Sequence, residues 1–360
     1  MGEEGIRAAL TAALTPPRAH GEPVATAALR TEAADFLVEE DLGFAPSGAG
    51  AHLLLKVRKT DANTAWVARE LARLAGCHPR EVGYAGLKDR RAVAIQWFSV
   101  PRPRGGAQLG GAGGEGFEVL EAHPHQRKLP RGALAGNRFT LRLRAPAGGG
   151  AALARCLAPR LAAVAARGVP NYFGPQRFGR DGANLGRAAG EDAPRLPPAE
   201  RGFVLSAARS LVFNAVLGAR VAEGSWEHLR AGDLAVLDGR GSLFRVEAPD
   251  ETLAARAARL EIHATGPLWG RGDPASGAGV RVLEQRIGAQ FAGECALCAA
   301  AGMAQERRSL RLRVADLECV PEADAAVLRF RLARGSFATA VLRELIAGAA
   351  PAPDQGASST

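Results

Sequence analysis

Long apolar runs and a regular cysteine pattern are both missing from this sequence. No uninterrupted apolar run approaches the roughly 18 residues that a membrane-spanning helix needs. Acidic Glu3 and Glu4 stand where a signal peptide would carry basic residues. The cysteines are odd in number and scattered, which favours reduced thiols over a disulfide framework. They are Cys77, Cys156, Cys295, Cys298 and Cys319. We therefore expect a soluble, cytoplasmic protein that does not associate with membranes.

Complete metal and nucleotide motifs are also lacking. Cys295 and Cys298 have the spacing of metal ligands, but no second Cys-x-x-Cys pair exists and both lie in a helical pattern, so buried thiols are expected. His123 and His125 likewise have no further ligands. The glycine-rich segment 104–116 contains no Gly-Lys-Ser/Thr, which excludes a P-loop and predicts a flexible hairpin loop. We expect neither a metal nor a cofactor.

Lysine and aromatic residues are scarce. Only four of the 46 basic residues are lysine, and aromatic residues make up 5% of the chain, whose formal net charge is +9. Arginine binds phosphate through two parallel hydrogen bonds and stacks on bases, so this balance suits an RNA partner. A chain rich in alanine, glycine and arginine is also what a GC-rich genome encodes. Charge alone therefore does not decide the partner.

The patterns predict strands and helices in one mixed arrangement over the first 167 residues. Apolar residues recur at helical spacing from Asn63 to Ala75, with Asp61 or Asn63 as the cap and Gly76 as the stop. A second helix is expected at 151–167. Alternation and β-propensity predict strands at 25–30, 36–40, 52–59, 92–100, 117–123 and 137–144.

A domain boundary is expected at Gly168, where Gly168-Val169-Pro170 breaks the second helix. Helices follow around 206–223, 252–260 and 279–303. The tail offers strands at 310–318 and 326–333 and a helix at 336–346, which are too few to bury a core alone. We therefore expect them to rejoin the first part. The predicted division is a discontinuous domain of 1–167 and 312–348, an inserted domain of 168–311, and a disordered tail of 349–360.

The stretch from Gly83 to Val100 carries the strongest chemical signal. A short strand breaks at Gly86 and resumes at Ala92, and the break contains Lys88-Asp89-Arg90-Arg91. Three cations around one carboxylate favour its ionised form, so Asp89 would be a standing anion, able to attack or to orient a reactant. The alternative is a polar hairpin whose charges face water, where ion pairs contribute little.

Five blocks, in order, resemble the bacterial tRNA pseudouridine synthase D family, and the resemblance covers roughly Arg30 to Ile346. A lone Gly-Leu-Lys-Asp-Arg is weak evidence, whereas five ordered blocks are specific. The blocks are Phe36-Leu37-Val38-Glu39-Glu40, Gly86-Leu87-Lys88-Asp89-Arg90, Gly136-Asn137-Arg138-Phe139, the segment 171–179 (NYFGPQRFG), and Gly335-Ser336-Phe337-Ala338-Thr339.

The resemblance implies an α/β (α+β) fold, in which a pseudouridine synthase catalytic domain with a central mixed or antiparallel sheet is interrupted by the family's own inserted domain. It also implies that Asp89 is the catalytic carboxylate. Arg30 aligns with a basic residue that pairs with this carboxylate and is usually lysine, so the charge is kept while the geometry changes. An ordinary surface arginine is the alternative for Arg30.

The same resemblance assigns substrate contacts. Phe36, Phe139 and Phe337 are aromatic residues in a chain that has few, and an extruded uracil needs flat partners. Phe139 takes the place where most pseudouridine synthases use tyrosine. Asn137 would hydrogen-bond the substrate through its amide. The alternatives are core phenylalanines and an asparagine that enters a strand from a turn.

Basic residues around these blocks are candidates for contacts to the RNA backbone, although any one of them could simply face solvent. For the segment 171–179 we favour a mainly structural role. The candidate backbone contacts are Lys88, Arg90, Arg91, Arg127, Lys128 and Arg177.

The leading hypothesis is a monomeric tRNA pseudouridine synthase that acts at uridine 13. One carboxylate suffices for this isomerisation, either as the nucleophile at C1′ or as the base that removes a C2′ proton, and the sequence does not choose. A nucleoside hydrolase is a second hypothesis, but it lacks the second carboxylate that such enzymes pair with the first. A non-catalytic RNA-binding module is the third, and for it Asp89 would not matter.

Overall fold

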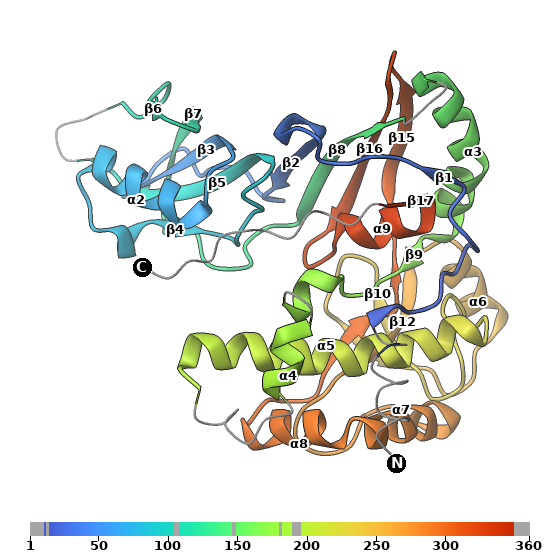
Figure 1. The fold of residues 1–360 in the computed structure, drawn as a ribbon. Helices are drawn as coiled ribbons and strands as arrows, with labels where there is room; N and C mark the ends of the chain where they lie inside the picture. Colours follow the sequence, from blue (N-terminus) through green and yellow to red (C-terminus); the bar gives the residue numbers. More distant parts are fainter. Residues whose placement is uncertain are drawn as a thin grey trace. The chain divides into compact units, whose positions relative to one another are not determined.

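The computed structural model describes residues 11, 14–103, 108–145, 149–179, 182–188 and 196–348. The chain divides into two compact units, each built from separate stretches of sequence (Figure 1). The sheet unit consists of Val24–Pro159, Ala315–Gly335 and Ile346–Thr360. The helical unit consists of Met1–Pro23, Arg160–Val314 and Ser336–Leu345.

A mixed sheet organises the sheet unit. Across it the strands follow the order β15-β16-β8-β2-β5-β3-β7-β6, and β4 pairs with β5 at one end. Strands β2 and β5 run parallel, whereas the other neighbours are antiparallel. The central mixed sheet expected from the sequence is confirmed. The strands are β2 (Phe36–Asp41), β3 (His52–Thr60), β4 (Gly83–Tyr84), β5 (Val93–Pro101), β6 (Gly113–Gly114), β7 (Phe117–His125), β8 (Gly136–Arg144), β15 (Ala315–Pro321) and β16 (Ala325–Ala333).

Helix α2 (Thr64–Ala75) covers β3 and β5. Its Asn63 side chain accepts a hydrogen bond from the Ala65 amide, and Gly76 ends it in the left-handed conformation at φ +63°, as the sequence predicted. Val67 and Leu71 on this helix pack against Val57 and Phe98 of the sheet in one buried cluster. This apolar contact fixes one end of the sheet.

The tail of the chain returns to the sheet, as the sequence predicted. Strand β16 pairs with β8 along its whole length, with Leu328 opposite Leu141 and Phe330 opposite Phe139. The predicted strand 310–318 is instead two strands. Its first residues form β14 (Arg311–Leu312), which pairs with β9 (Val169–Pro170), and a break at Val314 precedes β15.

Two further sequence predictions need correction. The expected strand 25–30 is reduced to β1 (Ala25–Thr26), which pairs with β17 (Ile346–Ala347). Beyond it Ala28 forms an isolated bridge with Arg144, and Arg30 adopts a positive φ of 62°. The expected helix 279–303 is split at Phe291 into α7 (Ala278–Gln290) and α8 (Ala292–Ala300). Residues 349–360, expected to be disordered, lie outside the described residues.

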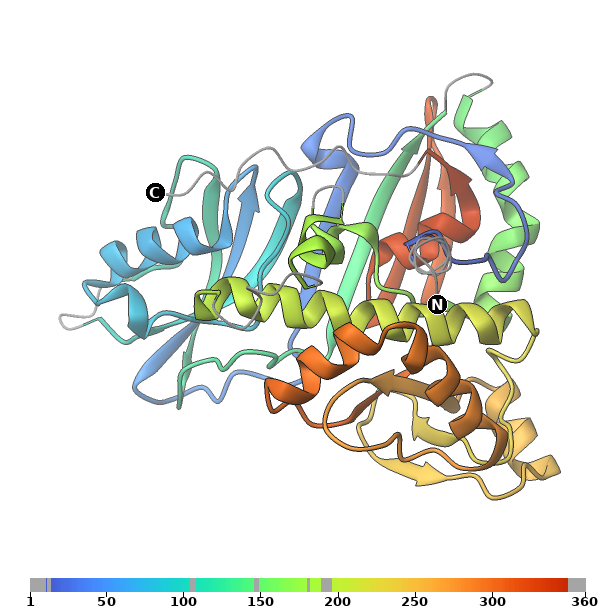
Figure 2. The same cartoon turned by 60° about the horizontal axis from the view of Figure 1, so that its bottom comes forward.

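Helix α5 (Pro198–Ala222) is the central element of the helical unit. It packs against β12 (Ile262–Leu268) and beside α7 and α8, which appear in orange in Figure 2. By length and composition Glu200–Ala222 would suffice to cross a membrane, but most of it is buried in this core. Strand β12 belongs to a four-stranded sheet. The described residues of the helical unit also contain shorter helices. The sheet also contains β10 (Leu234–Leu237), β11 (Leu243–Arg245) and β13 (Glu306–Ser309), and the helices are α4 (Ala183–Ala188), α6 (Glu251–Ala258) and α9 (Ala338–Leu345).

The segment 171–179 belongs to this core. Tyr172, Phe173 and Phe178 are buried in the same cluster as α5, and the Phe173 backbone exchanges two hydrogen bonds with the Asn214 side chain. This packing agrees with the mainly structural role favoured for this segment, and that role stays a prediction.

Helix α3 (Gly149–Arg167) ends at the predicted boundary. Gly168 follows at φ +71°, and a side chain there would meet the Leu312 carbonyl at 2.5 Å. The two structural units nonetheless differ from the predicted domains, because Ser336–Leu345 and residues 160–167 group with the helical unit. The division into a catalytic and an inserted domain stays a prediction.

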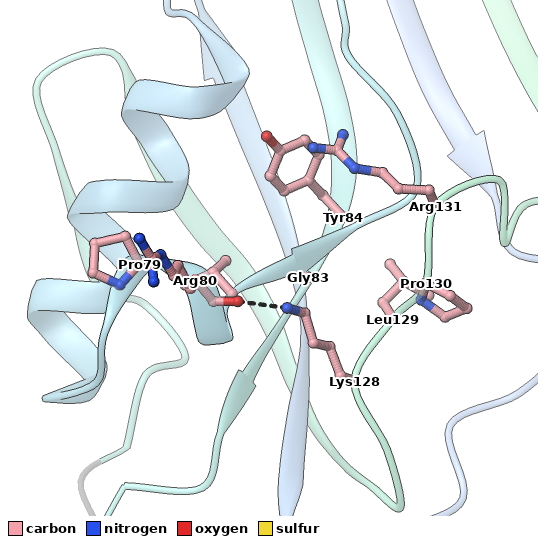
Figure 3. A pocket seen from close by; sticks show the side chains of 9 residues that line it. Pro79, Arg80, Gly83, Tyr84, Lys128, Leu129, Pro130 and Arg131 are labelled. Atoms are coloured by element: carbon pink, nitrogen blue, oxygen red, sulfur yellow. Dashed lines mark hydrogen bonds between the residues drawn. The ribbon is translucent and has the colours of Figure 1, made fainter. Parts of the chain in front are cut away.

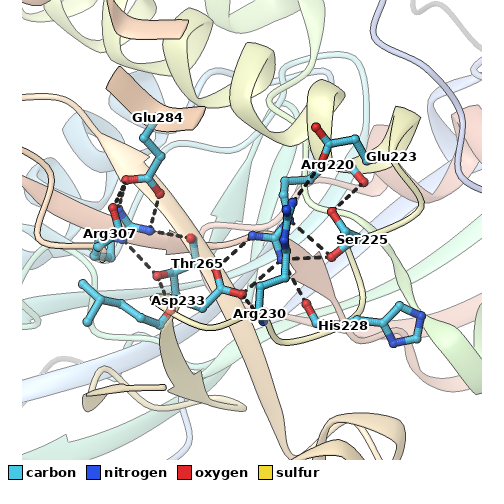
Figure 4. Close-up of polar contacts among 11 residues, drawn as sticks. Arg220, Glu223, Ser225, His228, Arg230, Asp233, Thr265, Glu284 and Arg307 are labelled. Atoms are coloured by element: carbon cyan, nitrogen blue, oxygen red, sulfur yellow. Dashed lines mark hydrogen bonds and ion pairs between the residues drawn. The ribbon is translucent and has the colours of Figure 1, made fainter. Parts of the chain in front are cut away.

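A buried ion pair holds the end of α5. Arg220 donates to both carboxylate oxygens of Asp233, at 2.9 and 3.1 Å, and to the Ser225 and His228 carbonyls (Figure 4). The side chains of Arg220 and Asp233 are 1% and 0% exposed. Close to them, Arg230 pairs with Glu223 on the surface.

We expect Asp233→Ala to destabilise the protein by about 3 to 5 kcal/mol, because it leaves the buried Arg220 charge without its partner. Glu223→Gln removes an exposed pair and should cost less than about 1 kcal/mol. Urea unfolding of both variants and wild type measures these changes. Equal effects of the two substitutions would contradict this view of the buried pair.

Candidate active site

Asp89 lies in the loop between β4 and β5, and its side chain is 43% exposed. A guanidinium nitrogen of Arg30 donates to its Oδ2 at 2.5 Å. The Arg30 side chain itself is only 12% exposed, so it reaches the loop from a sheltered position. The structure thus brings together the two residues that the sequence proposed as a catalytic pair.

The guanidinium of Arg30 stacks on Phe36, 4.1 Å from the centre of the ring. Such cation–π contacts contribute roughly 0.5 to 2 kcal/mol and restrict the orientation of the side chain. The left-handed backbone of Arg30 costs roughly 1 to 2 kcal/mol relative to an ordinary conformation. A strained backbone and a stacked side chain together aim this arginine at Asp89.

Phe36 and Phe139 form the apolar floor beside this pair. Their rings meet edge to face at 6.1 Å, and Phe139 stacks on Phe330 at 5.3 Å. They are only 4% and 7% exposed, which agrees with the core role that was the alternative for each phenylalanine. In this conformation Phe36 packs under the Arg30 guanidinium, and Phe139 packs against Phe36.

Asn137 carries an unused hydrogen-bond acceptor. Its Oδ1 is buried and has no hydrogen-bond partner within the described residues. Buried polar atoms are nearly always paired, so this acceptor is available to a water or to a ligand. Asn137 pairs with Glu40 of β2 and precedes Phe139 by two residues, so both side chains project from the same face.

Strand register places the predicted residues on one face of the sheet. Val38 lies opposite both Phe139 of β8 and Ala94 of β5, and Ala94 lies opposite Lys59 of β3. Because directly opposite residues point to the same side, the face with Phe36, Asn137 and Phe139 is also the face with Lys59. The Asp89 loop leads into β5, which is one of the strands that form this face.

Phe337 and Arg177 belong to the helical unit. Phe337 packs against Phe173 at 6.0 Å, and the Arg177 guanidinium lies 5.7 Å from the Phe337 ring. Burial lowers the pKa of Arg177 below its usual range, and Arg177 donates to Ser206. Their predicted roles toward the substrate and the RNA stay predictions.

Comparison with known proteins shows the family of this chain. Residues 19–186 and 183–345 match the family model described as "tRNA pseudouridine synthase D (TruD)". A protein named tRNA pseudouridine synthase D from Xanthomonas euvesicatoria is 46% identical, covering 91% of this chain and 94% of its own. This chain belongs to the TruD family.

Two further relatives agree. A Methylococcus capsulatus protein with the same name is 46% identical over 92% of this chain and 94% of its own. The crystal structure of a putative TruD protein from Methanosarcina mazei superposes with a TM-score of 0.69 at 20% identity, covering 92% of this chain and 95% of that one. At this identity, the match to the Methanosarcina mazei structure shows the fold alone.

In this TruD-family chain, three buried polar side chains hold the backbone of the Asp89 loop. The Gln96 amide donates to the Gly86 carbonyl at 2.7 Å, and the Thr64 hydroxyl accepts from the Lys88 amide at 3.1 Å. The Lys59 ammonium donates to the Asp89 carbonyl at 2.8 Å. Each of the three is 0% or 1% exposed. The loop is therefore fixed at three points around Asp89.

Sequence reasoning missed this clamp, although a signal was present. Lys59 and Gln96 fall at inward positions of alternating strands, in phase with the buried Val57 and Phe98. A polar side chain at such a position needs a partner, because burying it unpaired is costly. The partner is a loop backbone, which the sequence pattern does not reveal.

Lys88 has a different role from the one predicted. Its ammonium pairs with the fully buried Glu40 carboxylate, whose other oxygen accepts from the Trp97 amide at 2.8 Å. This pair leaves Lys88 little freedom to reach an RNA phosphate. Arg90, Arg91, Arg127 and Lys128, predicted for the same purpose, are all exposed.

Cys295 and Cys298 are buried in α8. Burial raises the pKa of Cys295 to about 12 and that of Cys298 to about 11, so both thiols stay protonated at neutral pH. Over the residues that the structure describes, no three His, Cys, Asp or Glu side chains are grouped as metal ligands.

Lys59 is buried close to several charges. Burial lowers its pKa to about 8, whereas the negative charges of Asp89, Asp61 and Glu40 oppose the shift and Lys88 adds to it. Its neutral form keeps two N–H groups, which match its two acceptors, the Ala62 and Asp89 carbonyls.

We expect Lys59 to make the protein more stable as the pH rises from 7.5 to 9.5. The folded pKa of about 8 is below the ordinary value of 10.5, so between them the unfolded chain binds more protons. The cost of burying the charge is complete below pH 8 and is relieved above it, by about 2 kcal/mol over this interval.

Urea unfolding of wild type and Lys59→Met at both pH values measures this effect. The difference between the two proteins isolates Lys59, because other groups that titrate in this interval are present in both. The stability of wild type relative to the variant should increase at pH 9.5. An unchanged difference would show that Lys59 does not carry a lowered pKa.

Proposed function

We propose that this chain is a tRNA pseudouridine synthase that converts uridine 13 of tRNA to pseudouridine. The observation that carries the proposal is the Arg30–Asp89 pair, which presents a part-exposed carboxylate above an apolar floor in a chain of the TruD family. Position 13 follows from the family resemblance. The cytoplasmic location and the monomeric state stay predictions from the sequence.

The reaction is an isomerisation that needs no redox partner and no group donor. The bond from N1 to C1′ is cleaved, the uracil turns within the site, and a bond from C5 to C1′ replaces the first. The C5 proton is lost as N1 gains one, so atoms balance. Asp89 acts either as the nucleophile at C1′ or as the base that removes the C2′ proton.

Arg30 is the positioning residue for this carboxylate. Its guanidinium donates to Oδ2, which leaves the other oxygen for the sugar. The clamp of Lys59, Thr64 and Gln96 prevents the loop from turning the carboxylate away. Preorganisation of this kind lowers the cost of reaching the transition state.

The extruded uracil is proposed to meet Asn137. Uracil carries an N3–H donor between two carbonyl acceptors, and the unpaired Oδ1 of Asn137 offers the matching acceptor. Phe36 and Phe139 line the floor below, and stacking of the uracil on Phe337 stays a prediction from the resemblance.

Asp89→Asn should reduce pseudouridine formation by at least roughly 10² to 10⁴-fold while tRNA still binds, because the amide is neither a nucleophile nor a base. The assay uses tRNA that lacks the modification and maps the product by position. Glu118→Gln, an exposed carboxylate on β7, is the matched control and should keep full activity.

The same assay separates the competing functions. Release of free uracil would indicate a nucleoside hydrolase. Binding of tRNA without any isomer, by wild type as well as the variant, would indicate a non-catalytic RNA-binding module. Product at a position other than 13 would keep the enzyme class and overturn the assignment of the site.

Arg30→Met should lower kcat more than it raises KM, because Arg30 orients Asp89 and does not itself hold the tRNA. Arg30→Lys keeps the charge but loses the planar fit to Phe36 and to the carboxylate, so it should recover part of the loss. Steady-state kinetics of both variants test this. A change confined to KM would assign Arg30 to substrate binding instead.

A further inference from the structure

A hollow lies in the sheet unit, on the strand that leads into the Asp89 loop. Figure 3 shows it between β4, the turn before it and the connection that follows β7. It has a volume of about 470 Å³, which is enough for a nucleotide. The lining residues are Pro79, Arg80, Val82, Gly83, Tyr84, Lys128, Leu129, Pro130 and Arg131.

The lining of this hollow is positively charged. It contains three cations, Arg80, Lys128 and Arg131, and no carboxylate. All three are exposed, so their charges are open to a ligand. Glu81 is adjacent in sequence, but its carboxylate accepts from the His78 amide. A site of one sign attracts an anion.

The walls are fixed by backbone contacts. The Leu129 amide donates to the Ser99 hydroxyl at 2.8 Å, and the Gly132 amide donates to the Ala85 carbonyl at 2.7 Å. The Lys128 ammonium donates to the Arg80 carbonyl at 2.5 Å, which joins the two walls. At Gly83 a side chain would meet the Leu129 carbonyl at 2.5 Å, so the close approach of the walls requires glycine. The hollow is therefore preformed.

One wall offers a flat surface. The Arg131 guanidinium lies 3.8 Å from the centre of the Tyr84 ring, and Tyr84 is supported from behind by Phe98 at 5.8 Å. RNA bases stack on arginine planes as well as on aromatic rings. The cationic lining would bind a phosphate, and the guanidinium plane of Arg131 would stack on the adjoining base.

The chain connects this hollow directly to the catalytic carboxylate. Tyr84 precedes Asp89 by five residues, which span at most about 18 Å when extended. A stacked strand rises about 3.4 Å per nucleotide, so a ligand in the hollow lies within about five nucleotides of a uridine at Asp89. This short distance to Asp89 favours a nucleotide of the tRNA chain over a free nucleotide as the ligand.

We propose that this hollow binds one phosphodiester and the adjoining base of the tRNA, a few nucleotides from the target uridine. The proposal rests on the proposed function and adds a recognition subsite to it. Arg80 and Arg131 contact the phosphate, and the Arg131–Tyr84 stack supports the base.

The test measures tRNA affinity as a function of salt for wild type and for Arg80→Gln/Arg131→Gln. Each lost phosphate contact lowers the slope of log K against log salt by about 0.7 to 0.9. Because the hollow holds one phosphate, the double variant should lose about 0.7 to 0.9 of slope and bind tRNA about tenfold more weakly at low salt. Its kcat at saturating tRNA should equal that of wild type, with KM raised.

Two controls make the result specific. Arg155→Gln removes an exposed arginine from α3, in the same unit, and should leave the slope unchanged. Arg131→Lys keeps the charge but not the planar stack. This single variant should therefore keep the wild-type slope but bind tRNA more weakly than wild type. Thermal melting confirms that each variant is folded.

The outcome also separates this proposal from the proposed function. If wild type forms no pseudouridine, the proposed function fails whatever the slopes are. If wild type forms pseudouridine and the double variant keeps the wild-type slope, or loses no more of it than Arg155→Gln, then the hollow does not bind the tRNA backbone and the proposal is overturned.

Discussion

The immobilisation of one short loop is the constraint on which the rest of the sheet unit depends. The Asp89 carboxylate is part-exposed, yet an exposed loop is free to move. The structure resolves this conflict by anchoring the loop backbone to Lys59, Thr64 and Gln96 below and the Asp89 carboxylate to Arg30 at the side. The carboxylate is part-exposed, whereas the three side chains that hold its loop are buried.

Several buried polar groups lie where the chemistry is proposed to occur. Lys59 and Glu40 lie on the same sheet face as Phe36 and Phe139, and each is paired. Such groups stabilise a fold less than apolar residues of the same size would, because charges lose their hydration. Their role here is to define one position for the loop, whereas Val57, Phe98 and α2 supply the apolar contact.

Local patterns predicted the local structure well. The cap at Asn63 and the stop at Gly76 fixed both ends of α2, and alternating residues located β5, β8 and β16. Predictions failed where a distant contact overrides the local pattern. Arg30 leaves its strand at a positive φ, and the run 310–318 divides between two pairing partners, β9 and β16. Neither outcome is encoded in a window of a few residues.

The amino-acid sequence by itself indicated the family, because ordered motifs depend only on residue order, and the resemblance then implied the mixed fold and the pairing of Arg30 with Asp89. Tertiary structure alone decided which side chains support that pair. Strand register brought Lys59 and Asn137 to one face, and folding enclosed Lys88 against Glu40. These contacts join residues far apart in the chain, and their energies come from burial and hydrogen-bond geometry that exist only once the sheet has formed.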